Sequence, residues 1–176
     1  MAPISPDAVV GTTVAMSFIL LGNAITQSTM GVPALLVDFP RPSSPEHAAA
    51  ARHLGRQWPV FWNMGNVFFR PISTLGIFGY GYASYAAYAA GSLTRRDWRM
   101  YALAAACHLI TVLHSAINMQ PTNAKIDALR EPKASGVDST MAEYYARKWV
   151  RLNTVRVLMP MIAGITALWQ TVKYPY

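Results

Sequence analysis

Two histidines and two arginines stand within or beside long apolar stretches of this 176-residue chain: His108, His114, Arg70 and Arg156. Histidine exchanges protons near neutral pH, and an arginine guanidinium binds oxyanions through several N–H donors. Ionisable groups are costly inside a membrane and usually mark a functional site there. Together the four residues predict a ligand or substrate site that combines proton transfer with the binding of an anion or an electron-rich oxygen.

Amides and a tryptophan accompany these groups on the same helical faces. A face of an α-helix recurs at i, i+3, i+4 and i+7, and each apolar stretch has one such polar face. A polar side chain without a partner in hydrocarbon costs roughly 2–7 kcal/mol on transfer scales, so these faces should point inward. Besides Arg70, the residues expected to bind the ligand are Asn23, Gln27, Asn63, Asn66, Asn118, Trp149 and Asn153.

The stretches that carry these faces are long enough to cross a membrane as helices. Each lacks Lys, Arg, Asp and Glu over its apolar part, and a span needs about 20 mostly apolar residues. The segments do not alternate in hydrophobicity, which argues against barrel strands. We expect an all-α fold, an antiparallel four-helix transmembrane bundle formed by one domain over residues 1–176, with helices at about 8–32, 60–91, 99–119 and 146–172.

Composition and charge agree with a multi-pass integral membrane protein, without distinguishing the plasma membrane from an endomembrane. Hydrophobic residues make up 53% of the chain and charged residues 13%, against about 25% charged residues in soluble domains. The net charge of +7 comes from residues that flank the apolar stretches, which argues against a nucleic-acid partner. Eleven of the fifteen Lys and Arg surround the first and third loops, so the positive-inside rule favours the cytoplasm for that end. The compact basic loop at 95–99 argues for the opposite orientation.

Most of the strongly polar groups should gather at that same end of the bundle. Short connections make neighbouring helices antiparallel, so the C-terminal ends of the first and third helices meet the N-terminal ends of the second and fourth. The alternative for the Asn, Ser and Thr residues is a structural role, as hydrogen bonds between helices that contribute about 0.6–2 kcal/mol each. The convergence of several ionisable and amide groups favours a functional pocket.

The order of several short motifs resembles the anthrone oxygenase-like family of small four-helix membrane proteins. The Pro-Thr-Asn sequence at 121–123 and the spacing of Trp149, Asn153 and Arg156 are the most specific parts. The resemblance covers nearly the whole chain. The other matching residues are Gly22-Asn23, Ser28, Val32-Pro33-Ala34-Leu35-Leu36, Trp58, Gly65, Pro71, Asn118-Met119-Gln120, Ile126, Leu129 and Pro160.

This resemblance implies a membrane-bound oxygenase that converts a polycyclic anthrone-type aromatic polyketide to an anthraquinone with O₂, in secondary metabolism. A base would remove an acidic C–H proton, and cations or amides would stabilise the resulting oxyanion. His114 is our first choice for the base and His108 the second, and replacing His114 by Ala is expected to abolish turnover. Arg156 and Arg70 would stabilise the oxygens. Asn118, Asn153 and Asn123 would donate hydrogen bonds, and Trp149 and Trp62 would stack on the rings.

The implied reaction needs O₂ as co-substrate and no organic cofactor, and no Gly-rich dinucleotide motif is present. A copper or iron site built on His47 and His53 stays open as an alternative. The expected partners are a hydrophobic aromatic small molecule and lipid, with a homo-oligomer or a biosynthetic partner enzyme left open. A second hypothesis is a non-catalytic membrane protein that binds or scaffolds a hydrophobic intermediate or partner enzyme. A transporter is less favoured, since no chain of ionisable residues crosses the bundle.

Overall fold

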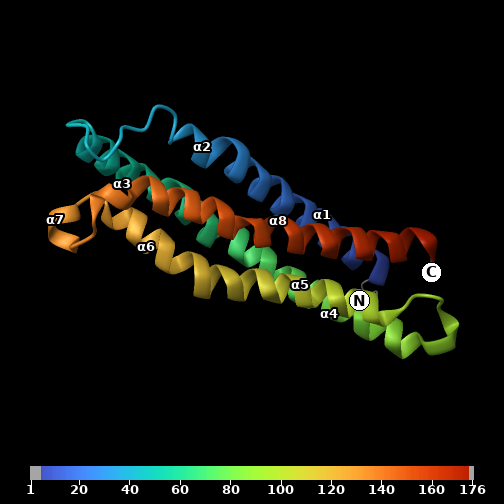
Figure 1. The fold of residues 1–176 in the computed structure, drawn as a ribbon. Helices are drawn as coiled ribbons and strands as arrows, with labels where there is room; N and C mark the ends of the chain where they lie inside the picture. Colours follow the sequence, from blue (N-terminus) through green and yellow to red (C-terminus); the bar gives the residue numbers. More distant parts are fainter. Residues whose placement is uncertain (1–4, 175–176) are drawn as a thin grey trace.

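The computed structural model describes residues 5–174, and within them the chain is helical without strands (Figure 1). This confirms the all-α fold class. The segments in chain order are α1 Pro6–Thr26, η1 Gln27–Gly31, α2 Val32–Ala34, α3 His47–Met64, η2 Gly65–Phe69, α4 Arg70–Ala90, η3 Gly91–Leu93, α5 Trp98–His114, η4 Ser115–Met119, α6 Gln120–Ala128, α7 Pro132–Ser135, η5 Ser139–Met141 and α8 Ala142–Lys173.

Short π-helical turns interrupt three of the long rods, at η1, η2 and η4. Each turn is followed, two residues after its end, by a proline: Pro33, Pro71 or Pro121. A proline has no N–H to donate, and its ring clashes with the carbonyl four residues earlier in a regular α-helix. The wider π turn moves that carbonyl away, so each rod continues past its proline.

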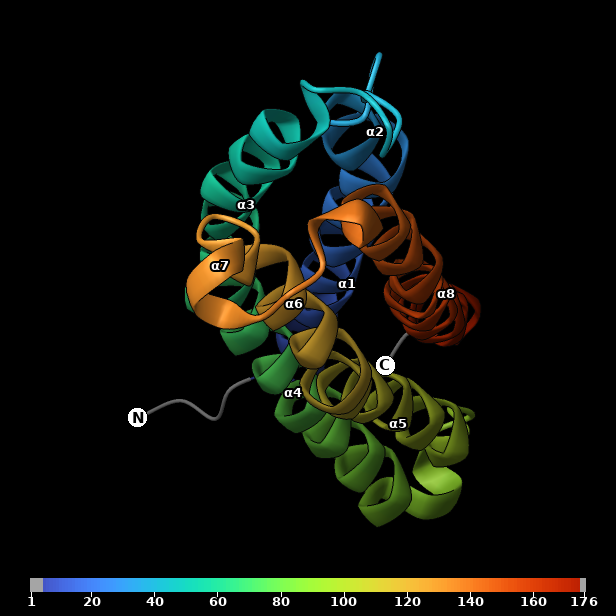
Figure 2. The ribbon, with the colours of Figure 1, turned by 60° about the vertical axis from the view of Figure 1, so that its left-hand side comes forward.

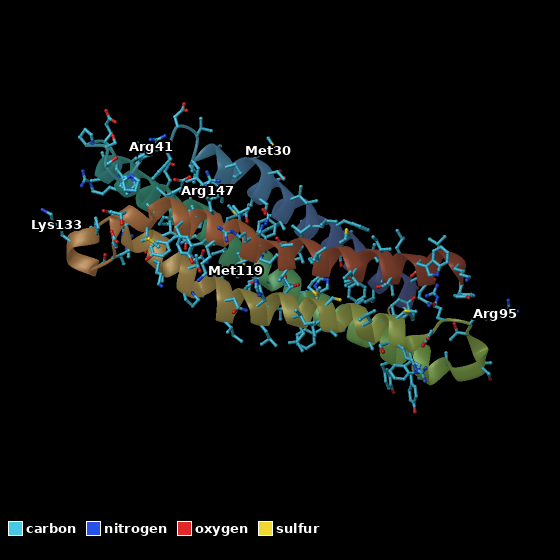
Figure 3. The ribbon with its side chains drawn as sticks, viewed as in Figure 1. Met30, Arg41, Arg95, Met119, Lys133 and Arg147 are labelled. Carbon is cyan, nitrogen blue, oxygen red and sulfur yellow. The ribbon has the colours of Figure 1, made fainter. Side chains whose placement is uncertain are left out.

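Three helices are long and apolar enough to cross a membrane, which indicates a membrane protein: Pro6–Ala34, Trp98–Ala128 and Ser139–Lys173. The span expected at 60–91 is not among them, although α4 forms there as a helix of 21 residues. Glycines, serines and tyrosines such as Tyr80 and Tyr85 lower its mean hydropathy. Many large apolar side chains on the rods are exposed, Phe78 and Ile117 among them. Figure 3 shows Met30, another of them, pointing away from the bundle.

Several expected boundaries were wrong. The second rod begins at His47 rather than near 60, so residues that we expected to belong to a loop form its first turns. Its apolar stripe, Ala51, Leu54, Gly55 and Trp58, is buried against α6, and this burial sustains the helix. The third rod continues to residue 128 instead of ending at 119, because η4 accommodates the proline there.

The long helices pack as neighbours in a ring. Helix α1 contacts α8 and α4, and α5 contacts α4 and α8 (Figure 2). At the end where α1 begins and α8 finishes, the buried Arg96 guanidinium donates to Asp7 Oδ1 and to the Tyr174 carbonyl, each at 2.6 Å. These contacts fix the α4–α5 connection to both helices. The opposite end lies under the 35–46 and 129–141 connections and holds the candidate site.

An apolar cluster closes that opposite end. Leu54 and Trp58 of α3 pack with Ile126 and Leu129 of α6, and all four are buried. A Cβ atom on Gly55 would lie 2.3 Å from the backbone nitrogen of Arg130, so only glycine permits this approach of α3 to α6. The cluster separates the interior of the ring from the loops above it.

Candidate functional site

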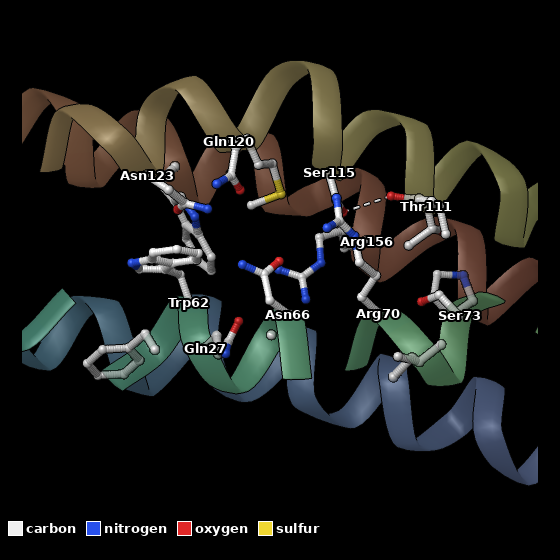
Figure 4. Close-up of a pocket in the computed structure, with 17 residues that line it drawn as sticks. Gln27, Trp62, Asn66, Arg70, Ser73, Thr111, Ser115, Gln120, Asn123 and Arg156 are labelled. Atoms are coloured by element: carbon white, nitrogen blue, oxygen red, sulfur yellow. Dashed lines mark hydrogen bonds between the residues drawn. The ribbon is translucent and has the colours of Figure 1, made fainter. Parts of the chain in front are cut away.

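A hollow lies inside the ring at the level of the three π turns (Figure 4). Its unoccupied space is about 700 Å³ including the open mouth, and about 60 Å³ of it admits the centre of a water molecule. By that measure the enclosed part is smaller than a typical ligand pocket of about 300–1,000 Å³, and the rest of the space belongs to the open mouth. The lining comprises Leu20, Gln27, Phe61, Trp62, Gly65, Asn66, Arg70, Ser73, Thr111, Val112, Ser115, Met119, Gln120, Asn123, Trp149, Arg156 and Pro160.

Two arginines of this lining, Arg70 of α4 and Arg156 of α8, have no ion pair or hydrogen bond among the described residues. No Asp or Glu is present in the lining. Figure 4 shows both guanidinium groups turned toward the space beside Asn66. Arg156 is partly buried and Arg70 is exposed. Because buried charges in proteins are normally paired, the described residues leave the charge of Arg156 without its usual partner.

Polar atoms without partners also face the hollow. The indole nitrogens of Trp62 and Trp149 and the side-chain oxygen of Gln27 are buried, and none has a hydrogen-bond partner in the described structure. Buried polar groups in native proteins are usually satisfied. The two indole N–H groups, together with the arginines, make the hollow rich in unused N–H donors, and the Gln27 oxygen adds an unused acceptor.

The π turns bring the lining side chains onto one side of their rods. In a regular helix three successive steps of four residues rotate a side chain by about 120°. Thr111, Ser115, Met119 and Asn123 are spaced by such steps, yet all of them line the hollow. The i→i+5 geometry of η4 has more residues per turn and cancels much of that rotation.

His114 lies outside the lining, between α5 and α8. Its Nε2–H donates to the Leu152 carbonyl at 2.9 Å, and its Nδ1 accepts from the Asn118 amide at 3.0 Å. A carbonyl oxygen can only accept, so the proton resides on Nε2 and the Nδ1 lone pair is engaged. This geometry favours a role for His114 in joining the two helices over the expected role as base.

His108 is fully buried, lies nearer the start of α5 than His114, and is likewise outside the lining. Its Nδ1–H donates to the Ser73 carbonyl at 3.2 Å, and its Nε2 contacts the Ser17 hydroxyl at 2.9 Å, which also contacts the Tyr80 hydroxyl at 2.8 Å. The network therefore connects α1, α4 and α5. Ser73 is the one member that also lines the hollow.

The structure brings only some of the expected binding residues together. Gln27, Asn66, Arg70, Asn123, Trp149 and Arg156 line the hollow, whereas Asn23, Asn63, Asn118 and Asn153 do not. Asn63 and Asn118 are exposed. Buried Asn153 donates to the Ala24 carbonyl at 2.9 Å and to the Ser28 hydroxyl at 2.8 Å, so it joins α8 to the first rod.

Replacing His114 by Ala should lower the stability of the protein by about 1–2 kcal/mol, the loss expected for one or two intramolecular hydrogen bonds. Turnover per folded molecule should keep most of its wild-type value, because the ring is outside the hollow. Thermal unfolding in detergent and turnover normalised to folded protein measure the two effects, with Asn118→Ala as the variant that loses one of the bonds. A folded but inactive His114→Ala protein would instead identify His114 as the base.

The two histidines considered as metal ligands, His47 and His53, are outside the lining of the hollow. His47 is buried, and its two ring nitrogens contact the Pro40 carbonyl at 2.7 Å and the Ser139 carbonyl at 2.9 Å. His53 is exposed on α3. Within residues 5–174 no group of three His, Cys, Asp or Glu side chains is arranged to hold a metal ion. His47 instead ties the two connections at the closed end together.

Several lining residues were missing from the expected site. Ser73, Thr111, Ser115 and Gln120 are the polar ones. Ser73 lies one turn after Arg70, so the i+3 rule could have found it. Gln120 precedes a proline at which we expected the third helix to stop. Phe61 and Leu20 supply apolar walls that no polar pattern marks.

Comparison with known families gives one match. The family model described as anthrone oxygenase matches residues 58–166, well over half of the chain. The matched stretch contains both unpaired arginines and both tryptophans of the hollow, while Leu20 and Gln27 precede it. No curated protein and no solved structure matched the chain.

Proposed function

Because the chain belongs to the anthrone oxygenase family, we propose that it oxidises a polycyclic anthrone to the corresponding anthraquinone with O₂, in the hollow between the π turns. The observation that carries this proposal is the pair of unpartnered arginines, Arg70 and Arg156, among aromatic walls and unused N–H donors. Trp62, Trp149 and Phe61 offer flat apolar faces to a fused ring system. The implied setting is the biosynthesis of aromatic polyketides.

The reaction requires the hollow to stabilise an oxyanion. Loss of a proton from the CH₂ group of an anthrone places negative charge on the ketone oxygen. The carbanion then transfers an electron to O₂, the two radicals combine at carbon, and protonation gives a hydroperoxide. Loss of water from that hydroperoxide leaves the second carbonyl. One anthrone and one O₂ thus yield one quinone and one water, and O₂ is the only oxidant required. The protein's part is to lower the energy of the anion.

No His, Asp or Glu belongs to the lining, so we propose that the C–H proton leaves to water in the hollow. The space that admits water centres is several times the minimum of about 10–15 Å³ for one molecule. Guanidinium charge beside the ketone oxygen would favour the ionised substrate and make so weak a base sufficient. We propose no metal or organic cofactor for this step, with O₂ as the sole co-substrate.

We further propose that the chain forms an antiparallel four-helix transmembrane bundle that crosses the membrane four times. Helix α4 is the least apolar of the rods, but it packs between α1 and α5 and equals α1 in length. Exposed Phe78, Tyr82 and Tyr85 give it an apolar outer face. The tyrosines lie toward the end of α4, where aromatic residues favour the membrane–water interface.

The test is turnover by purified protein in detergent or nanodiscs, with quinone formation, O₂ uptake and metal content measured on one sample. We expect quinone and O₂ uptake in equal amounts, faster than the uncatalysed oxidation. Activity proportional to bound copper or iron would retain the reaction and refute the cofactor-free form. Tight anthrone binding without any acceleration would favour the alternative function, in which the membrane protein only holds a hydrophobic intermediate. The absence of a His, Asp or Glu side chain for proton removal among the lining residues supports this alternative.

A further inference from the structure

We propose that the natural substrate carries a permanent acidic group, a carboxylate in its simplest form, in addition to the oxygen that becomes anionic during oxidation. This rests on the proposed function and names the substrate class of the same site. The hollow holds two guanidinium groups, Arg70 and Arg156, while its lining holds no carboxylate, and neither arginine is paired within residues 5–174.

A neutral anthrone cannot balance this charge. Deprotonation gives it one negative charge, which offsets one guanidinium and leaves the other without a counterion. The second guanidinium, that of Arg70, is exposed and shares its lining with Phe61, Trp62, Met119 and Val112, and a charge within a membrane is costly without a partner. A carboxylate on the substrate supplies the missing charge, and arginine is the side chain whose fork of donors matches it.

The two arginines differ in depth, which assigns their roles. Arg70 is exposed and stands at the first turn of α4, near the exposed Gln120. Arg156 is only partly exposed and lies among lining residues from α1, α4 and α8, including Leu20 and Pro160. Arg70 therefore receives the permanent carboxylate at the mouth, and Arg156 faces the reacting oxygen inside. Arg70 is then the residue that selects acidic substrates.

A phosphate of an anionic lipid could neutralise Arg70 in the same way as a substrate carboxylate, because both present charged oxygens to the guanidinium. The mouth faces side chains that we place in the membrane, including Ile117 and Val67. A test must therefore vary the charge of the substrate and the charge of the lipid separately.

The experiment compares two dihydroxyanthrones that differ only in a methyl or a carboxyl group on one outer ring. Wild type, Arg70→Gln and the control Arg151→Gln are assayed in nanodiscs of phosphatidylcholine. Arg151 is exposed on α8 and lies outside the lining. We expect wild type and the control to favour the carboxylated anthrone in kcat/KM by about 10- to 100-fold, and Arg70→Gln to lose most of that preference.

Equal kcat/KM values for the two anthrones in wild type, or a preference that survives Arg70→Gln, would overturn the inference while leaving the oxygenase intact. If phosphatidylglycerol raises turnover of the methyl compound in wild type but not in Arg70→Gln, the counterion is a lipid phosphate and the inference is wrong. If neither anthrone is turned over, the proposed function fails. Quenching of tryptophan fluorescence by the matched anthraquinones then tests the charge preference as binding alone.

Discussion

Arg156→Gln is expected to lower anthrone turnover about 100- to 1,000-fold, the effect of removing one group that stabilises an oxyanion. Arg156 lies in the hollow without an acidic partner among the described residues. Glutamine is neutral, so it keeps N–H donors but loses the charge that favours the ionised substrate. The loss should be in kcat more than in KM, because the charge develops only when the proton leaves.

Arg151→Gln is the matched control for this prediction, since it removes an arginine from the same helix on an exposed surface. It should leave turnover and stability near the wild-type values. Steady-state kinetics with quinone absorbance, normalised to folded protein, measures both variants. A wild-type kcat for Arg156→Gln would show that Arg156 does not stabilise the oxyanion, and Arg70 would then be the remaining arginine that could do so.

Gly76→Ala is expected to lower the stability of the protein by about 2–4 kcal/mol, from overpacking and disrupted buried hydrogen bonds. A Cβ atom on Gly76 would lie 2.1 Å from Nδ1 and 2.4 Å from Cε1 of His108. That ring is fully buried and held by Ser17 and the Ser73 carbonyl. The ring must leave both partners, or α4 must move away from α5.

Gly81→Ala on the same helix is the control, because a Cβ there meets nothing within 4 Å. It should be neutral or slightly stabilising, as alanine is the better helix former. Thermal unfolding of the two variants in the same detergent measures the difference. Equal melting temperatures would mean that His108 is not packed against α4, and the network through Ser17 and Tyr80 would lose its structural basis.

Periodicity predicted which rods form and much of what they place in the hollow. Arg70, Asn66, Trp149 and Arg156 are on the polar faces expected from regular helices, and they line the site. Trp149 and Arg156 are on α8, which no π turn interrupts, so the helical wheel stays accurate there. Asn66 lies in η2 and Arg70 directly after it. The family resemblance is confirmed by the match over residues 58–166.

The remaining differences have local physical causes. Asn118 belongs to η4, whose wider turn rotates it to the exposed side while Ser115 and Met119 face inward. Asn153 is on the expected face, but its side-chain amide donates a hydrogen bond to the first rod and does not line the hollow. A helical wheel gives the direction of the His114 side chain but not its hydrogen-bond partners. It therefore could not show that both ring nitrogens are already engaged.

Anaerobic absorbance spectroscopy tests most directly whether the hollow stabilises an anthrone as its oxyanion. Without O₂ the reaction stops after proton loss, and the ionised anthrone absorbs at longer wavelength than the neutral one. We predict that wild-type protein gives the spectrum of the anion at a pH where free anthrone is neutral, and that Arg156→Gln does not. Admission of O₂ should then convert the anion to quinone. A bound anthrone that keeps its neutral spectrum in wild-type protein would contradict the account.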